Sequence, residues 1–313
     1  MKTPRVSRRQ FALVAGGLVA GQVPLVRGAA FSAQDVVKRI QSNVGVEWQT
    51  TGVDGFKAGD PATPVRGIAT TAMATLDVLR QASKAGLNLI VTHEPTFFGQ
   101  LDGRPAPTPA SPAPGGTGRG GRGQAGVAPD DPVYLAKKEF IEKNGLVVWR
   151  FRDNWKARRE NDLATGLTET LGWSKSQVKG DPSSYIIPPA KFAALVSDIK
   201  KRLNVRGGLR VLGDPQATIQ RIVVLPGLIT LATVLKRFPG ADLIVIGETR
   251  DWGEGVEYPG DANAAGVKTG LITLGRTVSE DPGMRSCTTW LKGFIKDVPV
   301  QWITAGDPYW RPV

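Results

Sequence analysis

The chain has 313 residues, of which 41% are hydrophobic and 22% charged, so it is long and apolar enough to bury the core of one large or two modest α/β domains. Its single cysteine, Cys287, excludes an internal disulfide framework. The formal net charge of +12 includes several basic residues near the start, and the rest carries no nucleic-acid-binding motif, so we expect no specific nucleic-acid partner.

Residues 1–30 have the pattern of a twin-arginine signal peptide. Ser7-Arg8-Arg9-Gln10-Phe11 precedes a short apolar stretch, Ala12–Val26, and Arg27-Gly28-Ala29-Ala30 suits a small-residue cleavage site. The stretch is too short and too rich in glycine for a typical membrane span, so we expect no stable membrane anchor; an uncleaved anchor is the alternative. The pattern predicts export to a periplasmic or extracellular location.

Residues 31–184 predict a first α/β unit. Val36, Val37 and Ile40 recur at helical spacing and predict an amphipathic helix over Ala33–Asn43. A turn-rich loop, Gly52–Pro61, is followed by a predicted strand, helix and strand at Val65–Ala72, Thr75–Ala85 and Leu87–Val91. A strand–helix–strand crossover of this kind makes the two strands parallel neighbours.

An insertion interrupts this unit at residues 103–127. Its sequence is almost entirely Gly, Pro, Ala, Ser, Thr and Arg, which predicts a disordered segment because it offers too little apolar surface to bury. An Arg-Gly segment that binds polyanions is the alternative. Regular elements then resume, with a helix at Pro132–Asn144, a strand at Leu146–Phe151 and a helix at Asp162–Leu171.

Residues 185–313 predict a second α/β unit that completes the same fold. We expect strands at Tyr185–Ile187, Leu209–Leu212, Ile219–Leu225, Ala241–Ile246, Thr269–Leu274 and Val300–Ile303, and helices at Lys191–Leu203, Leu228–Phe238, Glu257–Ala265 and Pro282–Lys292. The predicted fold class is therefore α/β, with two related units, mixed and mostly parallel sheets, and a cleft between the units.

The strand ends carry the residues with chemical potential. His93, the only histidine of the chain, and Glu94 follow the apolar run Leu87–Val91, and Pro95 ends that strand. A lone histidine is more often structural, but the carboxyl end of a buried strand is where open α/β sheets build their sites. Further polar segments follow other predicted strands, at Arg152–Lys156, Gly247–Arg250 and Gly275–Glu280.

Several short motifs occur in one order: GVDGFKAGDP, LIVTHEPTFF, RDNWKARREND, LRVLGDP, ADLIVIGETRDW and LGRTVSEDPGM. With this set the chain resembles the Nif-three-like family (NGG-one-interacting factor three), also labelled GTP cyclohydrolase type two of the first class. The resemblance spans most of the chain after residue 30. It implies a two-domain α/β protein, commonly a toroidal hexamer and hence a homo-oligomer, with a two-metal centre and metal-dependent hydrolysis.

The same resemblance implies which residues form the site. By motif position, the ligands of a divalent ion (Zn, Fe or Mn) are His93, Glu94 and Glu280, with Asp153 and Glu248 as additional ligands or supporting carboxylates. The chain departs from the family pattern at three positions, where Arg152, Lys156 and Arg276 replace ligand side chains. Because these cations are not metal ligands, the pattern implies one weakly bound ion or none, in a basic, anion-binding cleft.

Three functions follow from these residues. The first is a metal-dependent hydrolase with a reduced site, acting on a small molecule, phosphorylated or not. The second is a non-catalytic family member that binds an anionic small molecule through Arg152, Lys156 and Arg276. The third is an assembly protein of the cell envelope.

Overall fold

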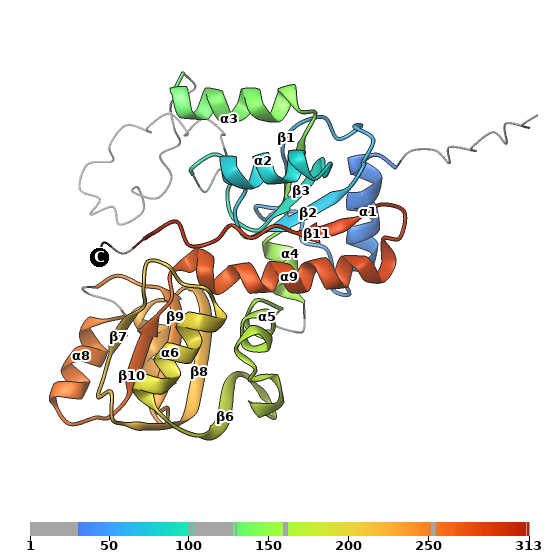
Figure 1. Ribbon diagram of the computed structural model, residues 1–313. Helices are drawn as coiled ribbons and strands as arrows, with labels where there is room; N and C mark the ends of the chain where they lie inside the picture. The colour runs from blue at the N-terminus through green and yellow to red at the C-terminus, as the bar shows by residue number, and fades with distance from the viewer. Residues whose placement is uncertain are drawn as a thin grey trace, which may run out of the picture. The chain divides into compact units, whose positions relative to one another are not determined.

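The computed structural model describes residues 31–99, 102, 128, 130–158, 162–251, 255–310 and 312. The predicted signal peptide, 1–30, and the predicted insertion, 103–127, lie outside the described residues. The described chain is α/β with two mixed sheets, which confirms the predicted fold class (Figure 1).

The first sheet has five strands in the order β1-β4-β3-β2-β11. They are β1 (Gly55–Ala58), β2 (Ile68–Thr71), β3 (Leu89–Thr92), β4 (Val147–Arg150) and β11 (Val300–Trp302). All neighbours are parallel except β1, which pairs with β4 in the antiparallel sense. Every residue of β2, β3 and β4 is buried, in keeping with the mostly apolar sequences of β3 and β4.

Helices cover both faces of this sheet. Leu89 and Val91 pack in a cluster with α1 (Ala33–Asn43), whereas Ile90 packs in another with α2 (Leu76–Lys84) and α3 (Pro132–Lys143). The two clusters follow from the alternation of side chains along β3.

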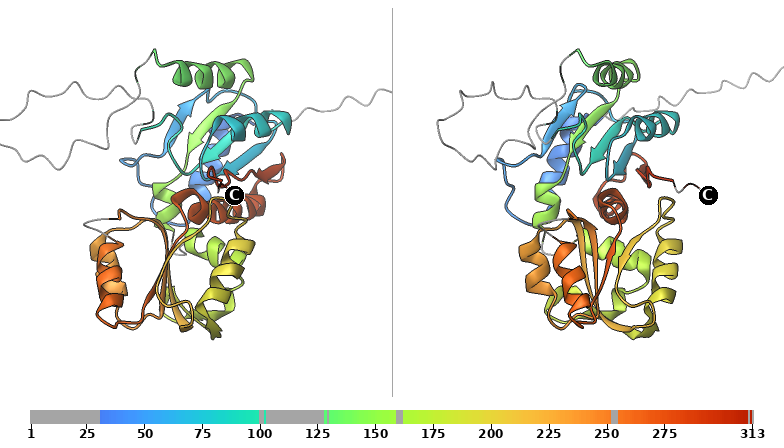
Figure 2. Two further views of the ribbon diagram at one scale, coloured as in Figure 1. Left: turned by 60° about the vertical axis from the view of Figure 1, so that its left-hand side comes forward. Right: turned by 90° about the vertical axis from the view of Figure 1, so that its left-hand side faces the viewer.

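The second sheet has six strands in the order β5-β6-β8-β9-β10-β7. They are β5 (Gln177–Val178), β6 (Asp181–Lys191), β7 (Arg210–Leu212), β8 (Thr218–Leu228), β9 (Leu243–Glu248) and β10 (Gly270–Thr273). The central neighbours β8, β9 and β10 are parallel, and the outer pairings are antiparallel. Helix α6 (Phe192–Arg202) packs on one face, and α7 (Leu231–Arg237) and α8 (Glu257–Ala264) pack on the other (Figure 2).

One long helix contacts both sheets. Helix α9 (Arg276–Phe294) packs on β2 and β11 of the first sheet and on β8 and β9 of the second (Figure 1). Helix α5 (Asp162–Leu171) runs against it, and a Cβ added at Gly166 would lie 2.4 Å from the Pro282 carbonyl oxygen. Glycine at position 166 therefore permits a close approach of the two helices.

The helix predicted to begin at Pro282 begins six residues earlier. Pro282 lies inside α9, although proline lacks the amide hydrogen that a helix interior uses. The residues from Val278 to Met284 are all buried, and we attribute the continuity of the helix to this packing. The last predicted strand also differs in its partner, because β11 pairs with β2 of the first sheet.

Other differences concern short or irregular elements. The predicted loop Gly52–Pro61 contains β1, and α4 (Asp153–Ala157) and the 3-10 turn Ser174–Ser176 were not predicted. Strand β6 is longer than Tyr185–Ile187 and has an irregular register between Ile186 and Ala190, around two prolines that cannot donate to a ladder. Helix α7 starts later than predicted because β8 continues to Leu228.

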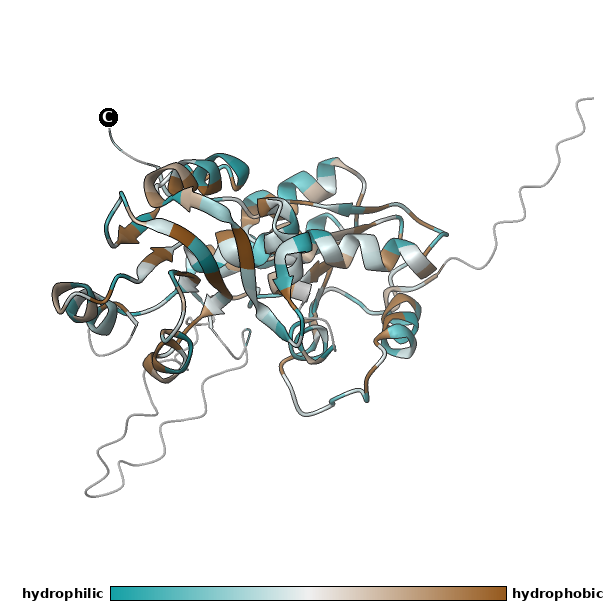
Figure 3. Cartoon of the chain, turned by 90° about the horizontal axis from the view of Figure 1, so that it is seen from below, coloured by the Kyte–Doolittle hydropathy of each residue, from teal (hydrophilic) through white to brown (hydrophobic). Residues whose placement is uncertain are grey.

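Hydropathy follows this arrangement. Figure 3 shows apolar residues concentrated along the strands, while the helices carry both apolar and polar residues. Within the described residues, no helix combines the length and apolar content needed to cross a membrane.

Candidate metal centre

The backbone holds His93 and Glu94 at the end of β3. The His93 amide donates to the Thr71 carbonyl at 3.1 Å, and the Glu94 amide donates to the Ala72 carbonyl at 2.8 Å, so the pairing with the neighbouring chain continues past the strand. Arg150 Nε on β4 donates to the His93 carbonyl at 3.2 Å. These bonds fix the position of both side chains, which are 0% and 3% exposed.

Glu280 comes from the second turn of α9. Gly275, with φ of +90°, forms the bend between β10 and this helix. Ser279 Oγ accepts from the Gly227 amide at 3.0 Å and donates to the Arg276 carbonyl at 2.7 Å. A Cβ at Gly227 would lie 2.7 Å from Glu280 Oε1, so glycine there leaves room for the carboxylate.

The structure brings together three of the predicted site residues. His93, Glu94 and Glu280 each offer one ligand atom, and these atoms lie within 4.8 Å of one another. Both ring nitrogens of His93 and Glu280 Oε2 are buried and have no hydrogen-bond partner among the described residues. Unpartnered buried polar atoms cost free energy, so these atoms point to an absent partner. An imidazole and two carboxylates fit the ligand set of Zn²⁺, Fe²⁺ or Mn²⁺.

Two arginines also point into this cluster. Arg276 Nη2 donates to Glu94 Oε1 at 2.8 Å, and its Nε lies 3.5 Å from Glu280 Oε1. Arg152 Nε lies 3.5 Å from the same Glu94 oxygen. Their side chains are 18% and 24% exposed, so part of each remains open to solvent. The guanidinium groups therefore compete with any cation for the carboxylates.

These charges and the burial shift two pKa values. Burial, followed by the charges of Arg152 and the solvent-exposed Lys156, holds the pKa of His93 well below its usual range. Burial and the neighbouring Glu94 raise the pKa of Glu280 to about 8. At neutral pH His93 is thus neutral, the form that binds metals, and Glu280 must lose a proton before it can bind one.

Asp153 and Glu248 are not part of this three-residue group. Asp153 accepts from the Val53 amide at 2.8 Å and from Arg152 Nη1 at 3.0 Å, so its carboxylate is already engaged. Glu248 is exposed at the end of β9, where its charge contributes to the raised pKa of Arg276. Their roles as ligands, like the ligand roles of the other three residues, stay predictions.

Two carboxylates that position the site, the partly buried Asp54 and the buried Asp102, were not predicted. Asp54 accepts from the amides of Arg152 at 2.6 Å and Asn154 at 2.9 Å, and so caps the short helix that carries Arg152. Asp102 accepts from Arg150 Nη1 at 3.2 Å and from the Phe97 amide at 3.1 Å, which holds the loop after Glu94. Arg150, a charged residue at the end of the apolar segment LVVWR, was a sequence signal for the Arg150–Asp102 pair.

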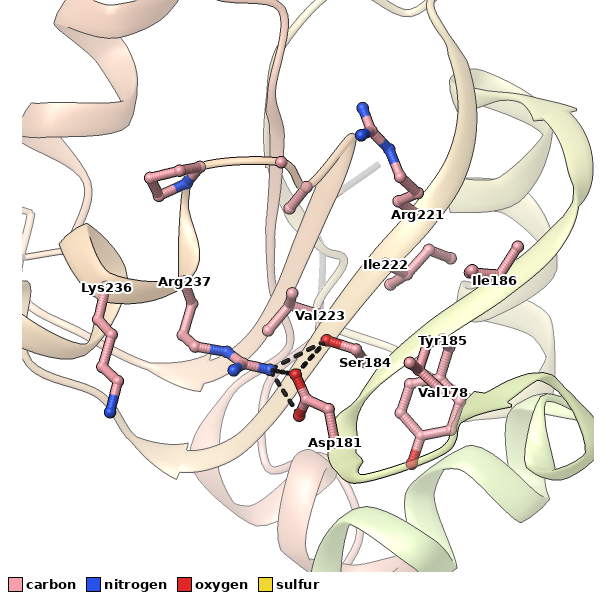
Figure 4. Close-up of a pocket in the computed structure, with 13 residues that line it drawn as sticks. Val178, Asp181, Ser184, Tyr185, Ile186, Arg221, Ile222, Val223, Lys236 and Arg237 are labelled. Atoms are coloured by element: carbon pink, nitrogen blue, oxygen red, sulfur yellow. Dashed lines mark hydrogen bonds and ion pairs between the residues drawn. The ribbon is translucent and has the colours of Figure 1, made fainter.

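Away from this site, a cavity of about 260 Å³ lies between β6, β8 and α7 (Figure 4). Arg237 donates there to both carboxylate oxygens of Asp181, at 2.6 and 2.8 Å, and to Ser184 Oγ at 3.0 Å (Figure 4). Hydrogen bonds from these partners hold the pKa of Asp181 below its usual range against the effect of burial. Both carboxylate oxygens of Asp181 accept from Arg237, so we interpret the pair as a structural tie between β6 and α7.

The comparisons with known proteins agree with this fold. The model of the family Duf34/NIF3 (NGG1p interacting factor 3) matches residues 32–109. A Staphylococcus aureus protein, SA1388, has a TM-score of 0.65 at 14% identity, with coverage of 90% of this chain and 99% of its own. A Bacillus cereus protein related to NIF3 has a TM-score of 0.63 at 12% identity, with coverage of 91% and 100%.

The protein ybgI, of unknown function, has a TM-score of 0.61 at 19% identity, with coverage of 89% of this chain and 100% of its own. No curated protein matches the sequence. At these identities the solved structures share the fold, and the family match over residues 32–109 adds the sequence relationship. The chain is therefore similar to the Duf34/NIF3 family over residues 32–109, and over most of its length it shares the fold of these solved structures.

Proposed function

We propose that this protein is a metal-dependent hydrolase with a reduced centre that holds one divalent ion through His93, Glu94 and Glu280. The observation that carries the proposal is the buried imidazole with two unpartnered nitrogens beside two carboxylates, all within 4.8 Å. A structural histidine would use its ring nitrogens in hydrogen bonds. A bound divalent ion would supply Lewis acidity and an activated water at neutral pH.

The residues around the ligands suggest the substrate class. Arg152 and Arg276 present guanidinium groups, whose planar donors suit phosphate and carboxylate oxygens. Lys156 adds a third positive charge at the exposed side. We infer that the substrate is a small anion, such as a phosphate ester, and that its oxygens would replace Glu94 as a partner of Arg276.

Metal analysis of protein purified without added metal tests the first part of the proposal. We expect the purified protein to retain up to one equivalent of divalent metal per chain, or to take up one equivalent of Zn²⁺, Fe²⁺ or Mn²⁺ on titration. His93→Ala should abolish that uptake, while Lys138→Ala on the exposed side of α3 should not affect it. Hydrolysis of 4-nitrophenyl phosphate by the metal-loaded protein tests the second part. Undiminished metal binding by the His93→Ala variant would refute the assignment.

The alternative function is non-catalytic binding of an anionic small molecule. Arg276 favours it, because its guanidinium contacts both carboxylates and would oppose a divalent ion at the same place. If the protein binds inorganic phosphate but takes up no divalent metal in calorimetry, this alternative replaces the hydrolase. If the protein binds neither phosphate nor divalent metal, the third hypothesis, a role in cell-envelope assembly, remains.

Two further proposals rest on the sequence and its family resemblance. We propose that the protein is exported by the twin-arginine route and forms a homo-oligomer with no stable membrane anchor. Replacing Arg8 and Arg9 by lysine should retain the protein in the cytoplasm in cell fractionation. Analytical ultracentrifugation of the mature chain should give a mass several times that of the monomer; a single monomeric species would contradict the oligomer.

A further inference from the structure

A separate cavity of about 290 Å³ lies beside the loop that follows β3. Its walls are mostly apolar and come from three places in the chain: Met73 and Leu76 at the start of α2, Pro95 and Phe98 in the loop, and Val133 on α3. Lys137 is the only ionisable residue among the described residues that line it. It uses none of the residues assigned to the metal centre.

Lys137 is buried, with an exposed fraction of 5%. Its Nζ donates to the Thr96 carbonyl and lies 5.2 Å from the centre of the Phe98 ring and 5.8 Å from that of Phe97. Both Thr96 and Phe98 line the cavity, so the amine is at the cavity wall. A long, flexible charged side chain normally reaches solvent, and its confinement beside apolar walls requires an explanation.

The carboxylate of Asp102 lies near this amine. Asp102 attracts it, but the Asp102 carboxylate is shared with Arg150 Nη1 at 3.2 Å and with two loop amides. Burial outweighs the attraction of Asp102 and lowers the pKa of Lys137 to about 8. A substantial fraction of the amine is therefore neutral near neutral pH, which is the nucleophilic form of lysine.

We propose that this cavity binds a small apolar aldehyde and that Lys137 forms an imine with it. The Nζ lone pair attacks the carbonyl carbon and forms a C–N bond; two protons from nitrogen and the carbonyl oxygen leave as water, and a C=N bond remains. No oxidant, reductant or metal is consumed. The apolar walls bind the hydrocarbon part of the aldehyde, and the buried amine supplies the one reactive group.

The neighbouring Lys138 provides a matched control. It lies next to Lys137 on α3, but its side chain is 50% exposed and pairs with Glu142 at 3.8 Å. At about pH 7.5, a lysine with a pKa of about 8 is roughly one-quarter neutral, against about one-thousandth for a lysine of ordinary pKa. After allowance for its weaker basicity, we expect Lys137 to react at least about tenfold faster than Lys138.

The test uses the full mature chain, hexanal and sodium cyanoborohydride, which reduces the imine and fixes the label. Peptide mapping by mass spectrometry should locate the hexyl group at Lys137 in preference to Lys138. The labelling rate at Lys137 should level off above about pH 8. Formaldehyde, which has no hydrocarbon chain to bind, should show a smaller preference for Lys137 than hexanal does.

A cavity-filling variant separates binding from reactivity. Val133→Trp places a large ring in the wall of the cavity and leaves the amine in place, so it should remove the preference for hexanal. Circular dichroism and the melting temperature establish whether this variant is folded. The proposal is wrong if hexanal labels Lys138 as fast as Lys137 in the unmodified protein, a result that needs no variant.

Discussion

Arg276 is the residue whose replacement should most change metal affinity. Its Nη2 lies 2.8 Å from Glu94 Oε1 and its Nε lies 3.5 Å from Glu280 Oε1, so it occupies one oxygen of each carboxylate. Arg276→Gln keeps a polar side chain of similar reach and removes the charge. We expect this variant to bind Zn²⁺ or Mn²⁺ more tightly than the parent protein.

The magnitude follows from the charges. Two unit charges 4 Å apart interact by about 4 kcal/mol at an effective dielectric constant near 20, so the guanidinium repels a divalent ion at that distance by about 8 kcal/mol. Most of this gain is offset, because Glu280 without the charge of Arg276 binds its proton more tightly, and the metal must displace that proton. We expect a net gain of about 1.5–3 kcal/mol, or roughly 10- to 150-fold in Kd.

Isothermal titration calorimetry of the metal-free proteins measures this change. Arg285→Gln is the matched control, because Arg285 is an exposed arginine on the same helix that lies over Trp302, with 5.7 Å between the guanidinium carbon and the ring centre. It should leave the metal affinity unchanged. If Arg276→Gln binds metal no better than the parent, Arg276 does not oppose a cation at this site, and the account of the reduced centre is incorrect.

Three further predictions concern stability. In the metal-free protein, the stability of Glu280→Gln relative to the parent should rise between about pH 4.5 and pH 8, by at most about 1.4 kcal/mol per pH unit. In this range the folded parent keeps a proton on Glu280 that the unfolded chain has lost, so the parent loses stability as pH rises. A difference in urea denaturation that does not change with pH would contradict this. Gly166→Ala should lower the free energy of unfolding by about 1–3 kcal/mol, because its Cβ meets the backbone of α9. Gly293→Ala, on α9 with open space around it, should raise that free energy by up to about 1 kcal/mol. Equal melting temperatures of the two variants would contradict the close approach of α5 and α9. Asp102→Ala should lower the free energy of unfolding by about 3–5 kcal/mol, because it leaves the fully buried Arg150 without this carboxylate. Adding Arg150→Met should recover part of that loss. A double variant that is less stable than the single one would refute the pairing.

The sequence predicted most of the fold because apolar patterns and glycine or proline boundaries mark its elements. The buried strands at Leu89–Thr92 and Leu243–Glu248 lie where continuous apolar runs predicted them. It did not predict that Val300–Trp302 would pair with Ile68–Thr71, since the pairing of distant strands depends on packing that no local pattern encodes. The extension of α9 through Pro282 has the same origin, because tertiary burial outweighed a local penalty.

The candidate site shows the same division. The position of His93 after a buried strand, combined with the family motifs, was enough to select Glu94 and Glu280 as its neighbours. The sequence did not predict that the side chains of Arg152 and Arg276 point into the site, because a long side chain can equally reach outward to solvent. Only the three-dimensional arrangement shows that Arg276 contacts Glu94 and that Asp153 is instead engaged by the loop around Val53.

The proposed hydrolase requires that His93, Glu94 and Glu280 hold one divalent ion. A crystal structure of the protein soaked in ZnCl₂, with anomalous diffraction data at the zinc edge, tests it most directly. We expect a single anomalous peak about 2.0–2.2 Å from a ring nitrogen of His93 and from oxygens of the two glutamates, with Arg276 displaced from Glu94. The absence of a peak beside His93, or a pair of ions there, would contradict it.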